Sequence, residues 1–321
     1  MGRVSWIDNL RGFGIVMVIL GHSTSPFHTF IYAFHMPLFF IISGFLWSDT
    51  TLENNSFGQY SKKKLKSLIV PYFKIAAVCL LVWGIIAPPI SANFSVGEYF
   101  SDIGKYIYGI IYSIGSSESL PNCSPIWFLT ALFCSSLLFY LIRKYYNNWI
   151  VLVILLLLGY AFTFVPRLPW NMNSAVIGTF FMLIGHYIKE KDLLSKNGII
   201  ICGVVLLLVV GVYLLWYQPY VDMDSNKYDN YWLFVIFAIV ICFVLLAIFS
   251  RIKWDNYSTK VLSFLSINAI AFFGYDYSAR SLVTLIPGVE GHWLLIFISK
   301  IVFLMAFAKL AKVLKINNYL Y

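Results

Sequence analysis

Long runs of apolar residues recur along this chain from near its beginning to its C-terminal end, and they constrain the fold more than any other feature. Ten of them approach the length of about 20 residues that a membrane-spanning helix needs. They lie at about 6–25, 29–48, 68–88, 126–142, 149–165, 172–189, 198–216, 231–250, 261–279 and 292–312. Sixty per cent of the 321 residues are apolar and 12% are charged, whereas a soluble domain is about one quarter charged. The sequence therefore predicts an all-α polytopic membrane protein with about ten transmembrane helices.

The same runs exclude other architectures. Membrane β-barrels show segments of about ten residues in which apolar and polar side chains alternate, and these runs do not alternate. No hydrophilic block separates them, so residues 1–321 are predicted to form a single integral-membrane domain without a soluble extension. No A-x-A-like site follows the first run, which is interpreted as a retained span and not as a cleaved signal peptide.

Basic residues are distributed unevenly between the two sets of loops. With the N-terminus placed in the cytoplasm, most of the 23 lysines and arginines fall in cytoplasmic loops or ends. The outer loops keep Lys105, Arg167, Lys227 and Arg280, and Lys74 and Lys300 fall within spans. This bias follows the positive-inside rule, so both termini are predicted to be cytoplasmic, in a multi-pass protein of the bacterial plasma membrane. Topology accounts for the net charge of +9, and the expected partners include membrane lipids and no nucleic acid.

The five cysteines have no metal-ligand spacing, and no metal is expected. Four lie in apolar runs, where cysteine is usually a small packing residue. Cys123 sits in the long outer loop, from about 89 to 125, so a structural disulfide is not expected. Within that loop, "VGEYFSDIGKYIYGIIYSI" places apolar residues on a helical period, which fits either a helix on the membrane surface or a lid over a site.

The first apolar run carries an ionisable residue at each end, in "RGFGIVMVILGH" from Arg11 to His22. Charged groups at membrane depth are costly and usually functional. Eleven residues place the two side chains on one helical face, separated by about 16 Å along the axis. The structural alternatives are an interfacial anchor for Arg11 and, for His22, a buried histidine satisfied by a neighbouring carbonyl.

A second histidine is expected at a similar depth. The second run begins with "FHMPLFFIISGFL", and His35 enters from the outer side, so His22 and His35 are predicted to meet on antiparallel helices. Pro37 would free a backbone carbonyl near His35. Imidazole is suited to moving protons near neutral pH, so the pair makes a plausible reaction centre. His28 in the outer turn is expected to be solvated, although it could touch an acceptor, and His186 and His292 are expected to be interfacial.

This geometry suggests a long, thin acyl carrier as substrate. A cation at the inner face and a proton-transfer group about 16 Å deeper suit coenzyme A, which has phosphates at one end and a thioester at the end of an extended arm. The cluster "KKKLK", from Lys62 to Lys66, leads into the third span at the same face. It also serves as a positive-inside signal, and attraction for phosphate is compatible with that role.

These residues resemble the membrane O-acyltransferases of acyltransferase family three, and most of all the branch containing fucose O-acetyltransferases. The resemblance is carried by "IDNLRGFGIVMVILGH", "FHMPLFFIISGFL", the basic run into "LIVPYF", "PIWFLTALF" and "SINAIAFFGYD", which together cover most of the chain. The first two segments are the specific ones. The resemblance implies an acyl-CoA donor on the cytoplasmic side and a sugar hydroxyl as acceptor, with no permanently bound cofactor.

The resemblance also implies site residues. His22 and His35 are expected to be catalytic, Arg11 to bind the donor, and Trp127 to match the family's Trp-Phe-Leu motif. Two positions depart from the family pattern. Lys63 and Lys66 stand in place of arginines spaced R-x-x-R, and lysine lacks their bidentate fork.

Asp276 is the second departure, because it stands where relatives often carry Asn or His. Its carboxylate is expected either to orient an imidazole or bind a sugar hydroxyl, or else to pair with Arg280 four residues later.

The leading hypothesis is an O-acyltransferase that moves acetyl from acetyl-CoA to a sugar hydroxyl of a cell-surface polysaccharide or lipid-linked glycan precursor. The alternative is a transporter or flippase for a lipid-linked sugar, since intramembrane histidines and basic clusters also fit proton-coupled transport. No inverted repeat of two halves is visible, which argues against transport. A purely structural membrane protein does not explain two histidines at matching depth.

Overall fold

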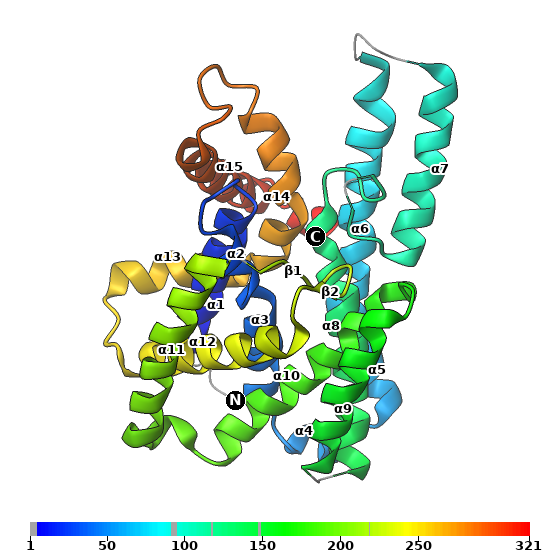
Figure 1. Cartoon of the computed structure of the whole chain (residues 1–321). Coiled ribbons are helices and arrows are strands. Elements are labelled where there is room, and N and C mark those ends of the chain that lie inside the picture. The colour runs from blue at the N-terminus through cyan, green and yellow to red at the C-terminus, as the bar shows by residue number, and fades with distance from the viewer. Residues whose placement is uncertain (1–4, 91–94, 117, 147–148, 218) are drawn as a thin grey trace.

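The computed structural model describes residues 5–90, 95–116, 118–146, 149–217 and 219–321. Almost all regular structure in these residues is helical, apart from one antiparallel pair of two-residue strands, β1 (Val221–Asp222) and β2 (Lys227–Tyr228). Figure 1 shows the helices gathered into one bundle, from which two helical hairpins project at the upper end, α6–α7 on one side and α14–α15 on the other.

The α-helices are α1 (Ser5–Gly21), α2 (His28–Tyr32), α3 (His35–Phe45), α4 (Thr50–Asn54), α5 (Phe57–Lys64), α6 (Val70–Cys79), α7 (Val96–Tyr112), α8 (Trp127–Tyr145), α9 (Ile150–Ala161), α10 (Met172–Glu190), α11 (Asn197–Tyr217), α12 (Tyr231–Arg251), α13 (Asn256–Ile267), α14 (Ala269–Val283), α15 (Trp293–Val313) and α16 (Asn317–Leu320). Short segments of other helix types are the π-helices η1 (Leu65–Ile69) and η2 (Leu80–Ile86) and the 3₁₀-helices η3 (Pro88–Ile90), η4 (Ser124–Ile126), η5 (Phe162–Phe164), η6 (Pro169–Asn171) and η7 (Leu193–Ser195).

Every apolar run expected to span the membrane folds as helix. By length and composition, six helical segments of the described chain qualify as membrane spans: His28–Phe45, Phe57–Ile90, Ser124–Tyr145, Asn197–Leu214, Tyr231–Arg251 and Trp293–Val313. The other four runs form α1, α9, α10 and the α13–α14 pair, which is broken at Asn268. The all-α polytopic membrane prediction is confirmed, while the number ten and the cytoplasmic termini stay predictions.

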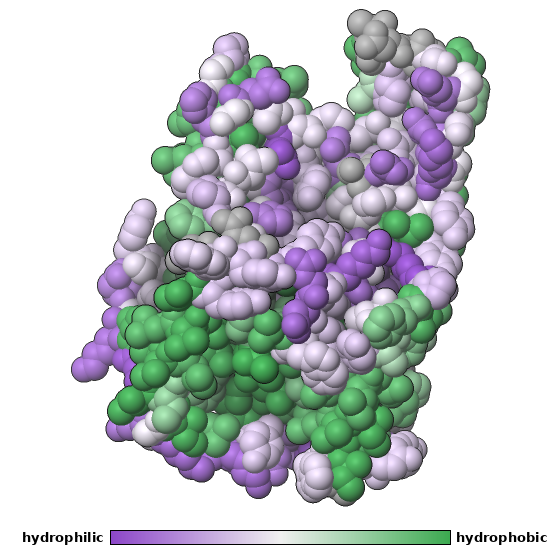
Figure 2. Space-filling view, in the orientation of Figure 1, coloured by the Kyte–Doolittle hydropathy of each residue, from purple (hydrophilic) through white to green (hydrophobic). Residues whose placement is uncertain are grey.

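The surface agrees with a membrane environment. In Figure 2 apolar residues cover the lower half of the view, over α9, α11 and α12. Large apolar side chains of α11 are exposed there, among them Val205, Leu208, Val209 and Val212. Polar residues surround a hollow at the upper end, between the α14–α15 and α6–α7 hairpins (Figure 2). A lipid environment removes the cost of exposing such apolar side chains to water.

Proline shapes the long helix that leads to the upper end. Pro71 has no amide hydrogen for the carbonyl of Ser67, and the π-helical turn η1 lies immediately before α6. The helix continues through η2 and then folds back into α7, which packs against η2 where Tyr106 approaches Gly84. The expected loop helix therefore exists as α7, and it lies beside the third span.

Two helices at the centre of the bundle approach each other unusually closely. A Cβ atom at Gly44 of α3 would overlap the carbonyl oxygen of Met182 on α10, and one at Gly185 of α10 would overlap the carbonyl oxygen of Ile41 on α3. Small residues at such crossings let helix backbones meet inside membranes. This contact fixes α3, and α3 carries His35 at its first position.

Candidate active site

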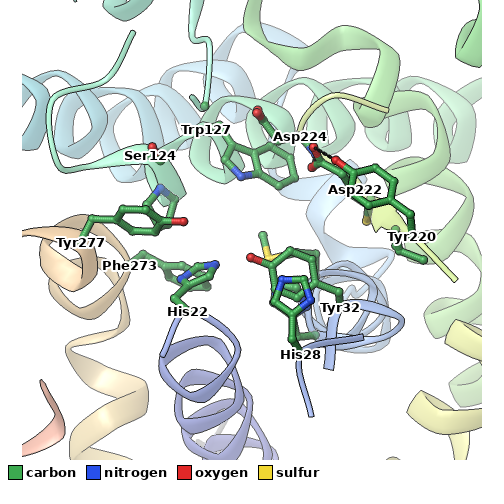
Figure 3. Close-up of a pocket in the computed structure, with 16 residues that line it drawn as sticks. His22, His28, Tyr32, Ser124, Trp127, Tyr220, Asp222, Asp224, Phe273 and Tyr277 are labelled. Atoms are coloured by element: carbon green, nitrogen blue, oxygen red, sulfur yellow. Dashed lines mark hydrogen bonds between the residues drawn. The ribbon is translucent and has the colours of Figure 1, made fainter. Parts of the chain in front are cut away.

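A cavity of about 280 Å³ lies at the upper end of the bundle, close to the hollow (Figures 2 and 3). Its walls come from segments far apart in sequence: the end of α1, α2, the start of α3, the stretch around η4, the β1–β2 hairpin and α14. The lining residues are His22, His28, Tyr32, His35, Met36, Gly115, Ser124, Pro125, Trp127, Tyr220, Val221, Asp222, Met223, Asp224, Phe273 and Tyr277. The long outer loop thus contributes residues that follow α7, and α7 itself does not line the cavity.

His22 follows directly after the last residue of α1, and a carboxylate holds its ring from behind. Its Nδ1 lies 2.8 Å from Oδ2 of Asp276 on α14. Asp276 is fully buried, whereas His22 reaches the cavity. The interpretation of Asp276 as an imidazole-orienting group agrees with this geometry. The (i, i+4) partner Arg280 instead approaches the backbone carbonyl of His22, at 3.5 Å.

Lys300 of α15 completes this arrangement. Its Nζ lies 2.8 Å from Oδ1 of Asp276 and 3.4 Å from the carbonyl oxygens of Ile19 and His22. Lys300 is fully buried. An isolated carboxylate at this depth would be very costly, and the ammonium compensates its charge.

The hydrogen bond to Asp276 selects the proton arrangement on His22. A carboxylate can only accept, so Nδ1 carries the hydrogen and donates it. In the neutral ring Nε2 is then the basic nitrogen, available to a substrate in the cavity. The carboxylate would also stabilise the imidazolium that forms when Nε2 takes up a proton.

The structure brings His35 next to His22, with 6.3 Å between ring centroids and the two ring planes perpendicular. His35 is buried and lines the cavity. Its Nδ1 lies 2.9 Å from the carbonyl oxygen of Ile31 and therefore donates to it. This carbonyl belongs to Ile31 in α2, six residues before Pro37, so it is not the one that Pro37 would free.

Aromatic rings form most of the remaining wall (Figure 3). Tyr277 lies 5.2 Å from the His22 ring, and Tyr32 lies 6.0 Å from it, measured between centroids. His28 is exposed, as expected of a solvated turn residue, and it also stacks on Tyr32 at 3.9 Å and lines the cavity. Trp127, the first residue of α8, is 7% exposed and also lines it.

The β1–β2 hairpin closes the cavity on another side with two carboxylates (Figure 3). Asp224 accepts two hydrogen bonds from Arg167, of 3.1 and 2.8 Å. Burial nevertheless raises the pKa of Asp224 to about 6. Asp222 folds back onto its own turn, where it accepts hydrogen bonds from the backbone amides of Asp224 and Ser225.

The residues expected to bind the donor lie away from this cavity. Arg11 is half-buried on α1, eleven residues before His22 and about 16 Å from it along the axis. Lys63 and Lys66 are exposed, and Lys63 donates to Oδ1 of Asn55. Lys64, from the same basic run, lies within electrostatic range of Arg11. The donor-binding roles of Arg11, Lys63 and Lys66 stay predictions, as do the catalytic roles of His22 and His35.

Sequence reasoning assigned no role to several residues of the site. Lys300 could have been recognised from the sequence, because a lysine in the middle of an apolar run is a functional candidate by default. No sequence pattern identifies Ser124, Tyr277 or the hairpin carboxylates as site residues, since only the folded chain brings their segments to the cavity.

Comparisons with known proteins show to which family the chain belongs. Residues 4–312 match the family model of acyltransferase family three, described as an acyltransferase domain. Nodulation protein NolL of Mesorhizobium japonicum is 27% identical over 45% of this chain and 38% of its own length. NolL of Sinorhizobium fredii is 27% identical over 54% of this chain and 47% of its own length. The chain thus matches less than half the length of these two relatives.

A third relative covers more of the chain. Inner membrane protein YcfT of Escherichia coli is 20% identical over 84% of this chain and 77% of its own length. No solved structure matches significantly. Since the family model spans nearly the whole sequence, this multi-pass membrane protein belongs to acyltransferase family three.

Proposed function

We propose that this protein is a membrane O-acetyltransferase of the bacterial plasma membrane. It transfers acetyl from acetyl-CoA to a sugar hydroxyl of a cell-surface polysaccharide or a lipid-linked glycan precursor. The observation that carries the proposal is the contact of His22 with the buried Asp276–Lys300 pair, next to a cavity walled by aromatic side chains. Family membership supports the acyl-transfer chemistry.

His22 acts as the general base. Its Nε2 removes the proton from the acceptor hydroxyl as that oxygen attacks the thioester carbonyl carbon. The carbon–sulfur bond then breaks, and the CoA thiolate leaves and takes the proton back from the imidazolium. Asp276 stabilises the imidazolium, and Lys300 keeps Asp276 ionised. The same geometry serves a covalent route, in which Nε2 first takes the acetyl group and then passes it to the hydroxyl.

His35 assists from beside His22, and the donor enters from the opposite end of α1. Arg11, with the basic run that includes Lys63 and Lys66, binds the phosphates of CoA at the cytoplasmic face. The thioester then extends along α1 toward His22, over about 16 Å. Trp127 supports the acceptor on the outer side of the cavity.

The test is transfer from radiolabelled acetyl-CoA by purified protein in detergent, with a panel of glycan acceptors. Wild type is expected to label an acceptor, and His22→Ala is expected to lose about 10³-fold or more of that rate. His292→Ala is the matched control, because His292 is exposed at the start of α15 and does not line the cavity. Its rate should equal that of wild type.

Two results would overturn the proposal. One is equal transfer by wild type and His22→Ala. The other is the lack of any transfer or CoA release by wild type, together with movement of a lipid-linked sugar across vesicles, which would establish the transporter alternative.

A further inference from the structure

Ser124 is a buried hydroxyl with an unmet hydrogen-bonding requirement. It is 6% exposed and lines the cavity at the start of η4. Within the described residues its Oγ has no hydrogen-bond partner. Leaving such a group unpaired is unfavourable, and buried polar groups nearly always find a partner. A ligand with hydroxyl groups would supply one.

The rest of the cavity suits a compact ring with one apolar face. Its volume of about 280 Å³ lies just below the usual range of ligand sites, which is about 300 to 1,000 Å³. Tyr32, Trp127 and Tyr277 offer aromatic surfaces to pack against the C–H bonds of a pyranose, and their polar atoms remain for its hydroxyls. The space fits one sugar ring and leaves any neighbouring residues of a glycan outside.

The charged side chains in the cavity lining are acidic. The lining includes two carboxylates and neither lysine nor arginine. Asp224 is compensated by Arg167, 2.8 Å away. Asp222 instead receives hydrogen bonds from Ser225 and Tyr220 in addition to the two amides, and no ion pair engages it among the described residues. Those bonds occupy its acceptor sites, so Asp222 acts on a ligand through its charge, which repels anions.

We propose that this cavity is a subsite for a single uncharged sugar ring of the acceptor. Ser124 hydrogen-bonds one of the ring hydroxyls, and Asp222 excludes acidic sugars such as uronates. The inference rests on the proposed function, because it names the class of acceptor that His22 would serve. Specificity of this kind comes from repulsion of the wrong ligand as well as attraction of the right one.

Binding is tested without catalysis, by saturation-transfer-difference NMR on the detergent-purified full chain. The probes are the methyl glycosides of glucose, galactose and mannose and the matching methyl glycosiduronates, which differ from them only at C6. At least one neutral glycoside is expected to bind about tenfold more tightly than its uronate, which is a difference of about 1.4 kcal/mol in binding free energy. This comparison on wild type needs no variant.

Two substitutions locate the effect. Ser124→Ala should weaken binding of the neutral glycoside about fivefold, because one hydrogen bond is lost. Asp222→Asn keeps the shape of the turn. It should bring the dissociation constant of the uronate to within about twofold of that of the neutral sugar. Ser116→Ala, at an exposed residue, and Asp102→Asn, at a half-buried one, lie outside the lining; they are the controls and should bind as wild type does.

The outcomes separate this inference from the proposed function. Uronates that bind as tightly as neutral sugars, or no weakening in Ser124→Ala, overturn the subsite even if acetyl transfer proceeds. If Ser124→Ala raises KM for acetyl-CoA and leaves the acceptor's KM unchanged, Ser124 binds the donor's arm and the inference also fails. Neutral sugars that bind selectively while wild type transfers no acetyl group refute the proposed function and leave the subsite standing.

Discussion

A carboxylate between a histidine and a lysine controls the chemistry at the scale of single residues. Asp276 contacts His22 through one oxygen and Lys300 through the other, and both contacts are 2.8 Å. The first contact gives the ring its orientation and tautomer, and the second compensates the charge. These two roles can be separated by substitution.

Asp276→Asn removes the charge and keeps the shape. We expect its kcat to fall by about 10³- to 10⁴-fold, as when an orienting aspartate is replaced beside a catalytic histidine, because the amide favours the wrong tautomer. KM for the acceptor should change little, since Asp276 does not line the cavity. Steady-state kinetics of acetyl transfer measure both constants. A kcat within tenfold of wild type would show that Asp276 does not position His22.

Lys300→Met tests the charge compensation. Removing one partner of a buried pair costs about 3–5 kcal/mol, because the other charge is left behind. Combining Lys300→Met with Asp276→Asn removes that charge and should recover most of the lost stability. Unfolding of the purified protein in detergent, compared across wild type, both single variants and the double variant, gives the interaction. If the losses of stability in the two single variants simply add up in the double variant, Lys300 and Asp276 do not form an energetically coupled pair.

The sequence predicted part of this site and could not predict the rest. His22 and His35 lie in neighbouring segments, so helical spacing alone could suggest that they meet. Asp276 lies 254 positions from His22, and nothing local distinguishes a partner of His22 from a partner of Arg280. The contact depends on α14 packing beside α1, a property of the assembled bundle that periodicity does not encode.

At the scale of elements, the crossing of α3 and α10 determines where His35 lies. Gly44→Ala would drive a methyl group into the backbone of Met182, and backbone cannot give way as a flexible side chain does. We expect a loss of about 2–3 kcal/mol or more and a lower acetyl-transfer rate, because α3 moves with His35. Gly211→Ala on α11 is the control, since nothing lies within 4 Å of its added Cβ. Equal stability of the two variants in thermal unfolding would rule out the close crossing.

The β1–β2 hairpin supplies a pH-dependent element at the mouth of the site. The pKa of Asp224 is raised by burial from 3.8 to about 6, so the folded state binds this proton more tightly than the unfolded chain. Its stabilising contribution is therefore full below about pH 4 and is lost as the pH rises through about 6. Asp224→Asn stays neutral throughout. Its stability relative to wild type should rise by about 2 kcal/mol between pH 4.5 and 7.5.

Thermal unfolding of wild type and Asp224→Asn at both pH values measures this difference. Comparing the two proteins at each pH cancels the titration of all other groups. A difference that does not change with pH would mean that Asp224 titrates as in the unfolded chain.

At the scale of the whole molecule, the two ends of the sequence build the site together. Lys300 reaches the carbonyl of Ile19, 281 positions earlier, and α1 packs against α12, α13, α14 and α15. Hydropathy alone identified the ten long apolar runs, and all of them fold as helix, because a segment in lipid must satisfy its backbone hydrogen bonds internally. It could not give the order in which the helices pack, nor therefore the cavity, because lipid-facing and protein-facing runs are both apolar.

The position of the cavity relative to the two membrane faces follows from topology, which cysteine labelling tests. The positive-inside rule places the β1–β2 hairpin outside and the turn after α10 inside. Lys227 in the hairpin and Ser195 in that turn are both exposed, so each can be replaced by cysteine in a variant whose native cysteines are removed. A membrane-impermeant maleimide should label Lys227→Cys in cells with an intact inner membrane, and Ser195→Cys only after that membrane is permeabilised. The reverse pattern would place the cavity at the cytoplasmic face, and with it the acceptor, so that transfer to an outer-face glycan precursor would be impossible.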